Sequence, residues 1–229
     1  MGGRREEILD AALAIADEQG LDAVSMRAVA DRVGVTPMAL YRHVSDKAAL
    51  LDGIAGRLLA ALLPPDEREV RVGEGEVRVG EGEGRAAEPR AWDERLRGLA
   101  YACREVARRH PWVAHLLFSR PAVTPDAVRA VDVIYTALVD AGVPDREVPR
   151  LERLISTFVI GFAASEASGR FVPGTLDPRG RRGRLPEGEL PGHGRLAPWL
   201  DLPVDLDAEF EADLEDIRRL VEAVARRAE

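Results

Sequence analysis

The sequence predicts an all-α protein, and three observations support that fold class. Apolar residues recur at helical spacing through most of the 229 residues, and no two alternating apolar runs are joined by a two-residue hairpin turn. The composition, 46% hydrophobic and 31% charged, suits a chain with a folded core. No apolar run approaches the roughly 18 uncharged residues that a membrane-spanning helix needs, which argues against a membrane protein.

Four helices are expected in the first 65 residues. The first spans residues 4–19 and ends at Gly20, a residue type that favours a left-handed helix cap. A serine that can cap the N-terminus and a glycine that can end the helix bound the second, residues 25–34. A Thr-Pro pair opens the third at residues 36–44, and a Ser-Asp pair opens the fourth at residues 45–65.

The composition changes abruptly at residues 66–89. This segment holds eight acids, four arginines and no apolar residue larger than valine. The heptapeptide Glu-Val-Arg-Val-Gly-Glu-Gly occurs at residues 69–75 and again at residues 76–82. We interpret the segment as a flexible acidic loop that was extended by duplication, because longer surface loops cost little free energy. A tail that binds a partner is the alternative.

Helical spacing resumes after the loop. The further helices expected are residues 91–109, 112–119, 125–141, 147–168 and 207–228. Residues 169–205 are rich in Gly, Pro and Arg, and we predict a long irregular connection there. The sequence thus divides into residues 1–46, a connecting helix at 47–65, the acidic loop at 66–89, and a second domain at 90–229.

Two long apolar stripes, on the helices at 147–168 and 207–228, predict a dimer. We expect them to pair with their symmetry mates in a four-helix interface. The residues expected there are Leu151, Ile155, Phe158, Phe162, Phe210, Leu214, Ile217 and Val221.

Charge and residue types exclude several classes of protein. The formal net charge of −8 has the wrong sign for a protein that coats nucleic acid or acidic membranes by bulk charge, although a compact basic surface remains possible. Cys103 is the only cysteine and the four histidines show no metal-ligand spacing, so we expect no disulfide, metal or cofactor. The charged start, residues 1–7, does not resemble a secretion signal, and a cytoplasmic location is expected.

Enzyme motifs are also missing from the sequence. It holds no Gly-rich phosphate loop, no Gly-x-Ser-x-Gly elbow and no Cys/His arrangement suited to nucleophilic catalysis. We therefore expect a protein that is not an enzyme.

The second and third helices have the proportions of a DNA-binding helix-turn-helix, although generic helix pairs share them. From residue 4 to residue 63 the sequence resembles the TetR family of transcriptional repressors. The matching residues are Gly20, Ser25-Met26-Arg27, Leu40-Tyr41-Arg42-His43-Val44 and Lys47. The resemblance continues, at Trp92, His110, Ser119-Arg120-Pro121, Gly142 and residues 158–166, into the ligand-binding half of tetracycline-repressor-type members. It implies a homodimer that binds an inverted-repeat DNA operator and is released by a small-molecule effector.

The resemblance implies which residues contact DNA. They are Arg27, Thr36, Pro37, Met38, Ala39, Tyr41, Arg42, His43 and Lys47. Residues 25–47 carry four basic and two acidic side chains, and this local excess has the sign that phosphate contacts require. Lys47, the only lysine, stands in the first turn of the fourth helix, where a phosphate can bind.

The sequence does not decide fully which residues contact the DNA bases. The first turn of the recognition helix is nearly all apolar and suits thymine methyl groups, so Arg27 is the best candidate for a guanine contact. Arg42 could read a base or bind a phosphate. Tyr41 could instead be a core aromatic, and His43 an ordinary surface imidazole.

A small-molecule cavity is implied for the second domain. The candidate residues are Tyr101, Cys103, His115, Phe118, Arg120, Tyr135 and Phe158, and a plain core or surface role stays open for each. Tetracycline repressors chelate magnesium through a histidine four residues before the arginine that Arg120 matches. That position is Leu116 here, and His115 is one residue away. We therefore expect an aromatic or largely apolar effector without a metal. The alternative function is a helical dimeric ligand-binding or scaffold protein that acts through protein partners.

Overall fold

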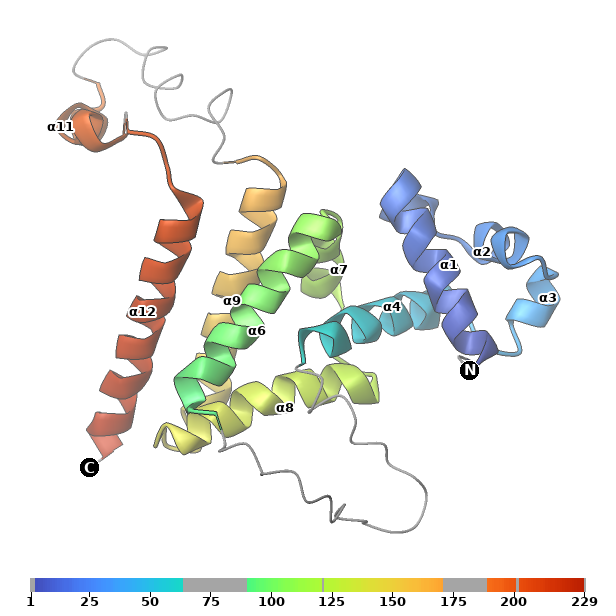
Figure 1. Ribbon diagram of the computed structural model, residues 1–229, viewed down its shortest axis with the longest axis horizontal. Coiled ribbons are helices and arrows are strands. Elements are labelled where there is room, and N and C mark those ends of the chain that lie inside the picture. Colours follow the sequence, from blue (N-terminus) through green and yellow to red (C-terminus); the bar gives the residue numbers. More distant parts are fainter. Residues whose placement is uncertain (1–2, 64–89, 121, 171–188, 201, 229) are drawn as a thin grey trace.

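A computed structural model describes residues 3–63, 90–120, 122–170, 189–200 and 202–228 of the chain (Figure 1). These residues form helices and no strand, which confirms the all-α prediction. The acidic loop expected at 66–89, with its duplicated heptapeptide, lies outside the described residues. The elements are α1 (Arg4–Gln19), η1 (Leu21–Ala23), α2 (Met26–Val33), α3 (Pro37–Leu40), α4 (Lys47–Leu62), α6 (Trp92–Arg109), α7 (Val113–Ser119), α8 (Pro125–Asp140), α9 (Val148–Ala167), α11 (Pro191–Leu200), α12 (Leu206–Ala225) and η2 (Arg226–Ala228).

Helices α1 to α3 gather at one end of the molecule, and α4 leads from them into the body formed by α6 to α9 (Figure 1). One apolar core joins these parts: side chains of α1, α2 and α4 pack in the same cluster as Ala107, Val113 and Leu116 of the body. A second core joins α6, α8, α9 and α12. The N-terminal helices are therefore packed onto the body rather than held by a flexible tether.

Helix α4 crosses α8 at very short range. A Cβ atom added at Gly56 of α4 would lie 2.0 Å from Oγ1 of Thr124, the residue that caps the N-terminus of α8. Only a residue without a side chain fits this crossing. Gly56 thus fixes how close the connecting helix lies to the body.

A buried ion pair lies against aromatic side chains of the second core. The guanidinium of Arg104 on α6 is 2% exposed and donates two hydrogen bonds of 2.7 Å to the carboxylate of Glu166 on α9. It also lies over the rings of Phe162 and Phe210, 5.4 and 4.8 Å from their centroids. The pair therefore ties α6, α9 and α12 together.

Two predictions for the C-terminal third need correction. The connection expected to be irregular at 169–205 contains the helix α11, although its sequence has glycines and a proline, Pro198, inside it. The two apolar stripes expected to face a symmetry mate instead meet each other within one chain, as the 4.8 Å contact of the Phe162 and Phe210 rings illustrates. Buried in this intrachain core are Leu151, Ile155, Phe162, Phe210, Leu214 and Val221, with Phe158 and Ile217 partly buried beside them.

The predicted stripes are covered because α12 packs against α9 in the same chain. The exposed large apolar side chains of these two helices are Leu154, 40% exposed, and Leu220, 36% exposed. A dimer through α9 and α12 would use these side chains rather than the buried six. None of the helices in the described ranges is long and apolar enough to cross a membrane.

Candidate functional site

The helix-turn-helix forms as its local signals predict. The hydroxyl of Ser25 accepts a hydrogen bond from the backbone N–H of Ala28 and caps α2, and the hydroxyl of Thr36 accepts one from Ala39 and caps α3. Gly34 joins the helices with φ 75°, a left-handed conformation that most other residue types resist. Helix α3 is shorter than expected, because residues 41–43 continue as turns that include i to i+3 hydrogen bonds.

The recognition segment presents apolar and aromatic side chains to solvent. Met38 is 74% exposed and Tyr41 49% exposed, while Leu40 between them is fully buried and fixes the segment on the core. Arg42 and His43 are exposed as well. The side chain of Tyr41 is thus available to a partner, which disfavours a purely core role for it.

Two of the basic residues near this surface differ in whether their side chains are available to a binding partner. Arg27 is 87% exposed, and its guanidinium lies 4.0 Å from the carboxylate of Asp31, one helical turn away. Arg32 is held by α1, because its guanidinium donates to both carboxylate oxygens of Glu18. The side chain of Arg27 is therefore available to a partner, whereas Arg32 supports the packing of α2 on α1.

Lys47 is exposed and is the first residue of α4. The carboxylate of Asp46 just before it caps the helix by accepting a hydrogen bond of 2.8 Å from the backbone N–H of Ala49. This hydrogen bond holds the pKa of Asp46 below its ordinary value. Because an anion already caps the helix, a phosphate here would be held by the Lys47 ammonium rather than by the helix N-terminus.

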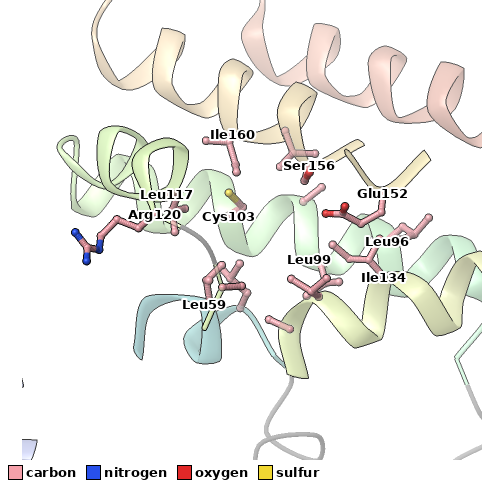
Figure 2. Close-up of a pocket in the computed structure, with 16 residues that line it drawn as sticks. Leu59, Leu96, Leu99, Cys103, Leu117, Arg120, Ile134, Glu152, Ser156 and Ile160 are labelled. Atoms are coloured by element: carbon pink, nitrogen blue, oxygen red, sulfur yellow. The ribbon is translucent and has the colours of Figure 1, made fainter. Parts of the chain in front are cut away.

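A cavity of about 200 Å³ lies in the body, between α4, α6, α8 and α9 (Figure 2). Its wall is mostly aliphatic. Among the described residues, four polar side chains interrupt it, those of Cys103, Arg120, Glu152 and Ser156. The remaining lining residues are Leu59, Leu62, Leu96, Leu99, Ala100, Leu117, Ala122, Ala130, Val131, Ile134, Val159 and Ile160.

Cys103 and Arg120 are the two predicted ligand-binding residues that line this cavity. Burial raises the pKa of the Cys103 thiol to about 11, so it is a neutral part of the wall at pH 7. The Arg120 guanidinium points out of the cavity (Figure 2) and donates to the Asp52 carboxylate at 2.5 Å and to the Ala48 carbonyl at 3.0 Å, both in α4. Arg120 therefore connects the cavity wall to the start of α4.

The other predicted ligand-binding residues lie elsewhere. Tyr101 packs edge-on against Phe210 and donates its hydroxyl to Glu211, and burial raises its pKa. His115 and Phe118 are exposed on α7. Tyr135 and Phe158 belong to the second core and are not among the lining residues.

No histidine lines the cavity within the described part of the chain, and Leu116 is buried in the core that joins α1 to α7. In that same part, no group of three or more His, Cys, Asp or Glu side chains lies close enough to hold a metal.

Sequence reasoning missed Glu152 and Ser156. They lie four residues apart on α9, followed by Ile160 after four more, so all three share one face of the helix. That face differs from the apolar stripe of Leu151 and Ile155, which predicted a dimer interface. A second stripe at the same spacing, with two polar residues in it, was the available signal.

A second contact ties the N-terminal helices to the body. The Asp17 carboxylate of α1 accepts a hydrogen bond of 2.8 Å from Trp112 Nε1 and lies 2.7 Å from His110 Nδ1. Both partners lie at the turn between α6 and α7, and Arg120 follows the last residue of α7. Two separate polar contacts thus connect the body to the helices that carry the recognition surface.

Comparison with known families agrees with this two-part architecture. Residues 8–54 match the family model described as bacterial regulatory proteins, tetR family. Residues 86–187 match the model described as the tetracyclin repressor-like C-terminal domain. The first match covers the helix-turn-helix, and the second covers most of the body with the cavity.

Similar proteins include two curated regulators and one solved structure. The HTH-type transcriptional repressor DrrR1 of Streptomyces coeruleorubidus is 30% identical over 161 residues, 70% of this chain and 53% of that protein. An HTH-type transcriptional regulator of Saccharopolyspora erythraea is 30% identical over 183 residues, 80% of this chain and 67% of that protein. The chain thus spans about half the length of the former and two thirds of the latter. The crystal structure of the Streptomyces coelicolor TetR family protein ActR in complex with actinorhodin aligns with TM-score 0.74 and 27% identity, covering 98% of this chain and 99% of that one.

Proposed function

Because the chain belongs to the TetR family of bacterial regulatory proteins, we propose that it is a ligand-responsive transcriptional regulator that binds operator DNA. The observation that carries this proposal is the course of α4. This helix begins at Lys47, beside the recognition segment, and its last turns contribute Leu59 and Leu62 to the cavity wall. One helix therefore belongs to both the surface suited to DNA and the cavity suited to an effector.

On the DNA side, the recognition segment supplies apolar contacts and the flanking cations supply charge. Met38 and Tyr41 are exposed enough to contact thymine methyl groups and the backbone, and Lys47 can pair with a phosphate. Arg27 is the exposed cation best placed for a base contact. In this assignment Lys47 contributes to affinity for any DNA, and Arg27 contributes to the preference for a particular sequence.

On the effector side, Arg120 couples the cavity to helix α4. Arg120 is a lining residue of the cavity, while its guanidinium holds the first two turns of α4 through Asp52 and Ala48. A ligand that displaces this side chain would change the position of α4 and with it the recognition segment. We infer repression that is relieved by induction, because a shift of α4 changes the separation of two reading heads in a dimer.

The regulator would act as a homodimer on an inverted repeat, with half-sites one helical turn, about 34 Å, apart. Leu154 and Leu220 are the exposed apolar side chains of α9 and α12 and supply the centre of the dimer face. Because its proposed partner is operator DNA, we propose that the protein acts in the cytoplasm, without catalytic activity and without a bound metal.

Fluorescence anisotropy with the intergenic DNA upstream of the gene tests the proposed function. We expect a sequence-selective complex that weakens as salt rises, and a scrambled duplex serves as the control. A scaffold that acts only through protein partners would form no such complex. Equal binding to the native and scrambled duplexes would overturn the proposal.

A further inference from the structure

Glu152 is an acidic side chain in the cavity wall, and no side chain in the described part of the chain pairs with it. Its carboxylate points into the cavity beside the hydroxyl of Ser156, one turn further along α9 (Figure 2). Within the described residues Glu152 makes no hydrogen bond or ion pair, whereas the Ser156 hydroxyl donates to the Arg153 carbonyl. Both side chains are partly buried, and Leu154 between them in sequence faces solvent.

The other polar groups of the cavity do not balance this charge. Among the described lining residues Arg120 is the only cation, and its guanidinium is already bonded to Asp52 and Ala48 outside the cavity. Cys103 is neutral, because its pKa is raised to about 11. In the part of the wall that the structure describes, Glu152 is thus a carboxylate without a compensating cation on a mostly aliphatic surface.

An ionised carboxylate that a ligand cuts off from water loses hydration, and this loss is offset only if the ligand supplies a charged or hydrogen-bonding partner. A cationic group on the ligand compensates this loss of hydration best, since charge-assisted hydrogen bonds are about twice as strong as neutral ones. An anionic ligand would be repelled by Glu152. The oxygen of Ser156 can accept a second hydrogen bond from the same ligand group.

We propose that the effector is a largely apolar molecule with one protonated amine, and that this amine binds between Glu152 and Ser156 while the apolar part fills the aliphatic end of the cavity. This inference rests on the proposed function and specifies the effector class of the same site. The inference adds the requirement that the effector carries a positive charge, which the size and apolar character of the cavity alone would not impose.

Three probes of similar shape test the charge requirement: 1-naphthylmethylamine, 1-naphthylmethanol and 1-naphthoic acid. Calorimetric titration of the full chain at pH 7 should give an affinity for the amine at least about tenfold above that for the alcohol, with the acid weakest. Glu152→Gln, which keeps the size of the side chain, should remove the preference for the amine. Asp132→Asn on α8 removes an exposed acid outside the cavity and should keep it.

Each outcome decides the proposal. Equal affinity for the amine and the alcohol, no measurable amine binding, or a preference that survives in Glu152→Gln would overturn it. Glu152→Asp retains the charge and should retain part of the preference, which separates loss of charge from loss of fold. Anisotropy of operator DNA without any compound reports the proposed function separately, so a failure of the charge requirement cannot be mistaken for a failure of DNA binding.

Discussion

Substitution of Glu166 by Gln should destabilise the protein by removing the charge opposite a buried guanidinium. Arg104 is 2% exposed and the side chain of Glu166 11% exposed, and two hydrogen bonds of 2.7 Å join them. Removal of one partner of a buried ion pair costs about 3 to 5 kcal/mol. Glutamine keeps one acceptor oxygen, and Asp207, 2.8 Å from Arg104, offers partial compensation. We therefore expect a loss of about 3 kcal/mol, at the lower end of that range.

Chemical denaturation at fixed protein concentration measures this loss, and the melting temperature should fall by about 6 to 12 °C. Glu105→Gln is the matched control on α6: its side chain is 48% exposed and pairs with Arg109, so its effect should stay within about 0.5 kcal/mol. If Glu166→Gln were as mild as this control, the buried pair would not be holding α6 to α9.

The stability lost in Glu166→Gln should also depend on pH. Hydrogen bonds from Arg104, and then from Arg108, lower the pKa of Glu166 from its ordinary value of 4.5. A lowered pKa in the folded state gives stability that is fully present above pH 4.5 and is lost as pH falls through the folded-state pKa. The stability difference between wild type and Glu166→Gln should therefore be constant above about pH 5 and narrow below it. A difference that stays unchanged down to pH 2 would refute the assignment.

Three further predictions concern DNA binding and assembly. Lys47→Ala should weaken binding to every DNA sequence alike and lower the salt slope by about one per subunit, whereas Arg129→Ala on the surface of α8 should change neither. Arg27→Ala should cost about 1 to 3 kcal/mol per half-site on the best operator and less on DNA altered at the contacted base pair; equal losses would indicate a phosphate contact. Leu154→Glu should convert dimers to monomers in sedimentation experiments, while Val139→Glu, at an even more exposed apolar position of α8, should leave dimers intact.

The sequence predicted those parts of the fold that local chemistry determines. Ser25, Thr36 and Gly34 bound α2 and α3 as expected, because a capping hydroxyl and a left-handed glycine act within a few residues. Pro198 lies inside α11 although proline opposes a helix interior, so local signals gave no indication of that helix.

The sequence could not show what covers an apolar stripe. Leu151 and Phe210 carry the spacing of a buried helix face, and that spacing is the same whether the chain itself or a second copy provides the contact. Glu152 was missed for a related reason: a polar residue next to an apolar stripe is usually solvated, and only the convergence of α4, α6, α8 and α9 places it in a cavity wall. Both are tertiary properties that helical periodicity does not contain.

The contacts of α4 determine how an effector could reach the DNA. Thr124 fits against Gly56 with no room for a methyl group, so the middle of α4 cannot move closer to α8. Arg120 holds the N-terminal turns of α4, and Asp17 holds α1 to the turn between α6 and α7. With its middle blocked on the α8 side, α4 can respond to a filled cavity mainly by rotation about this crossing. A rotation there would break the contact of Arg120 with Asp52 and Ala48. The presence or absence of this contact would therefore distinguish the DNA-binding conformation from the released one.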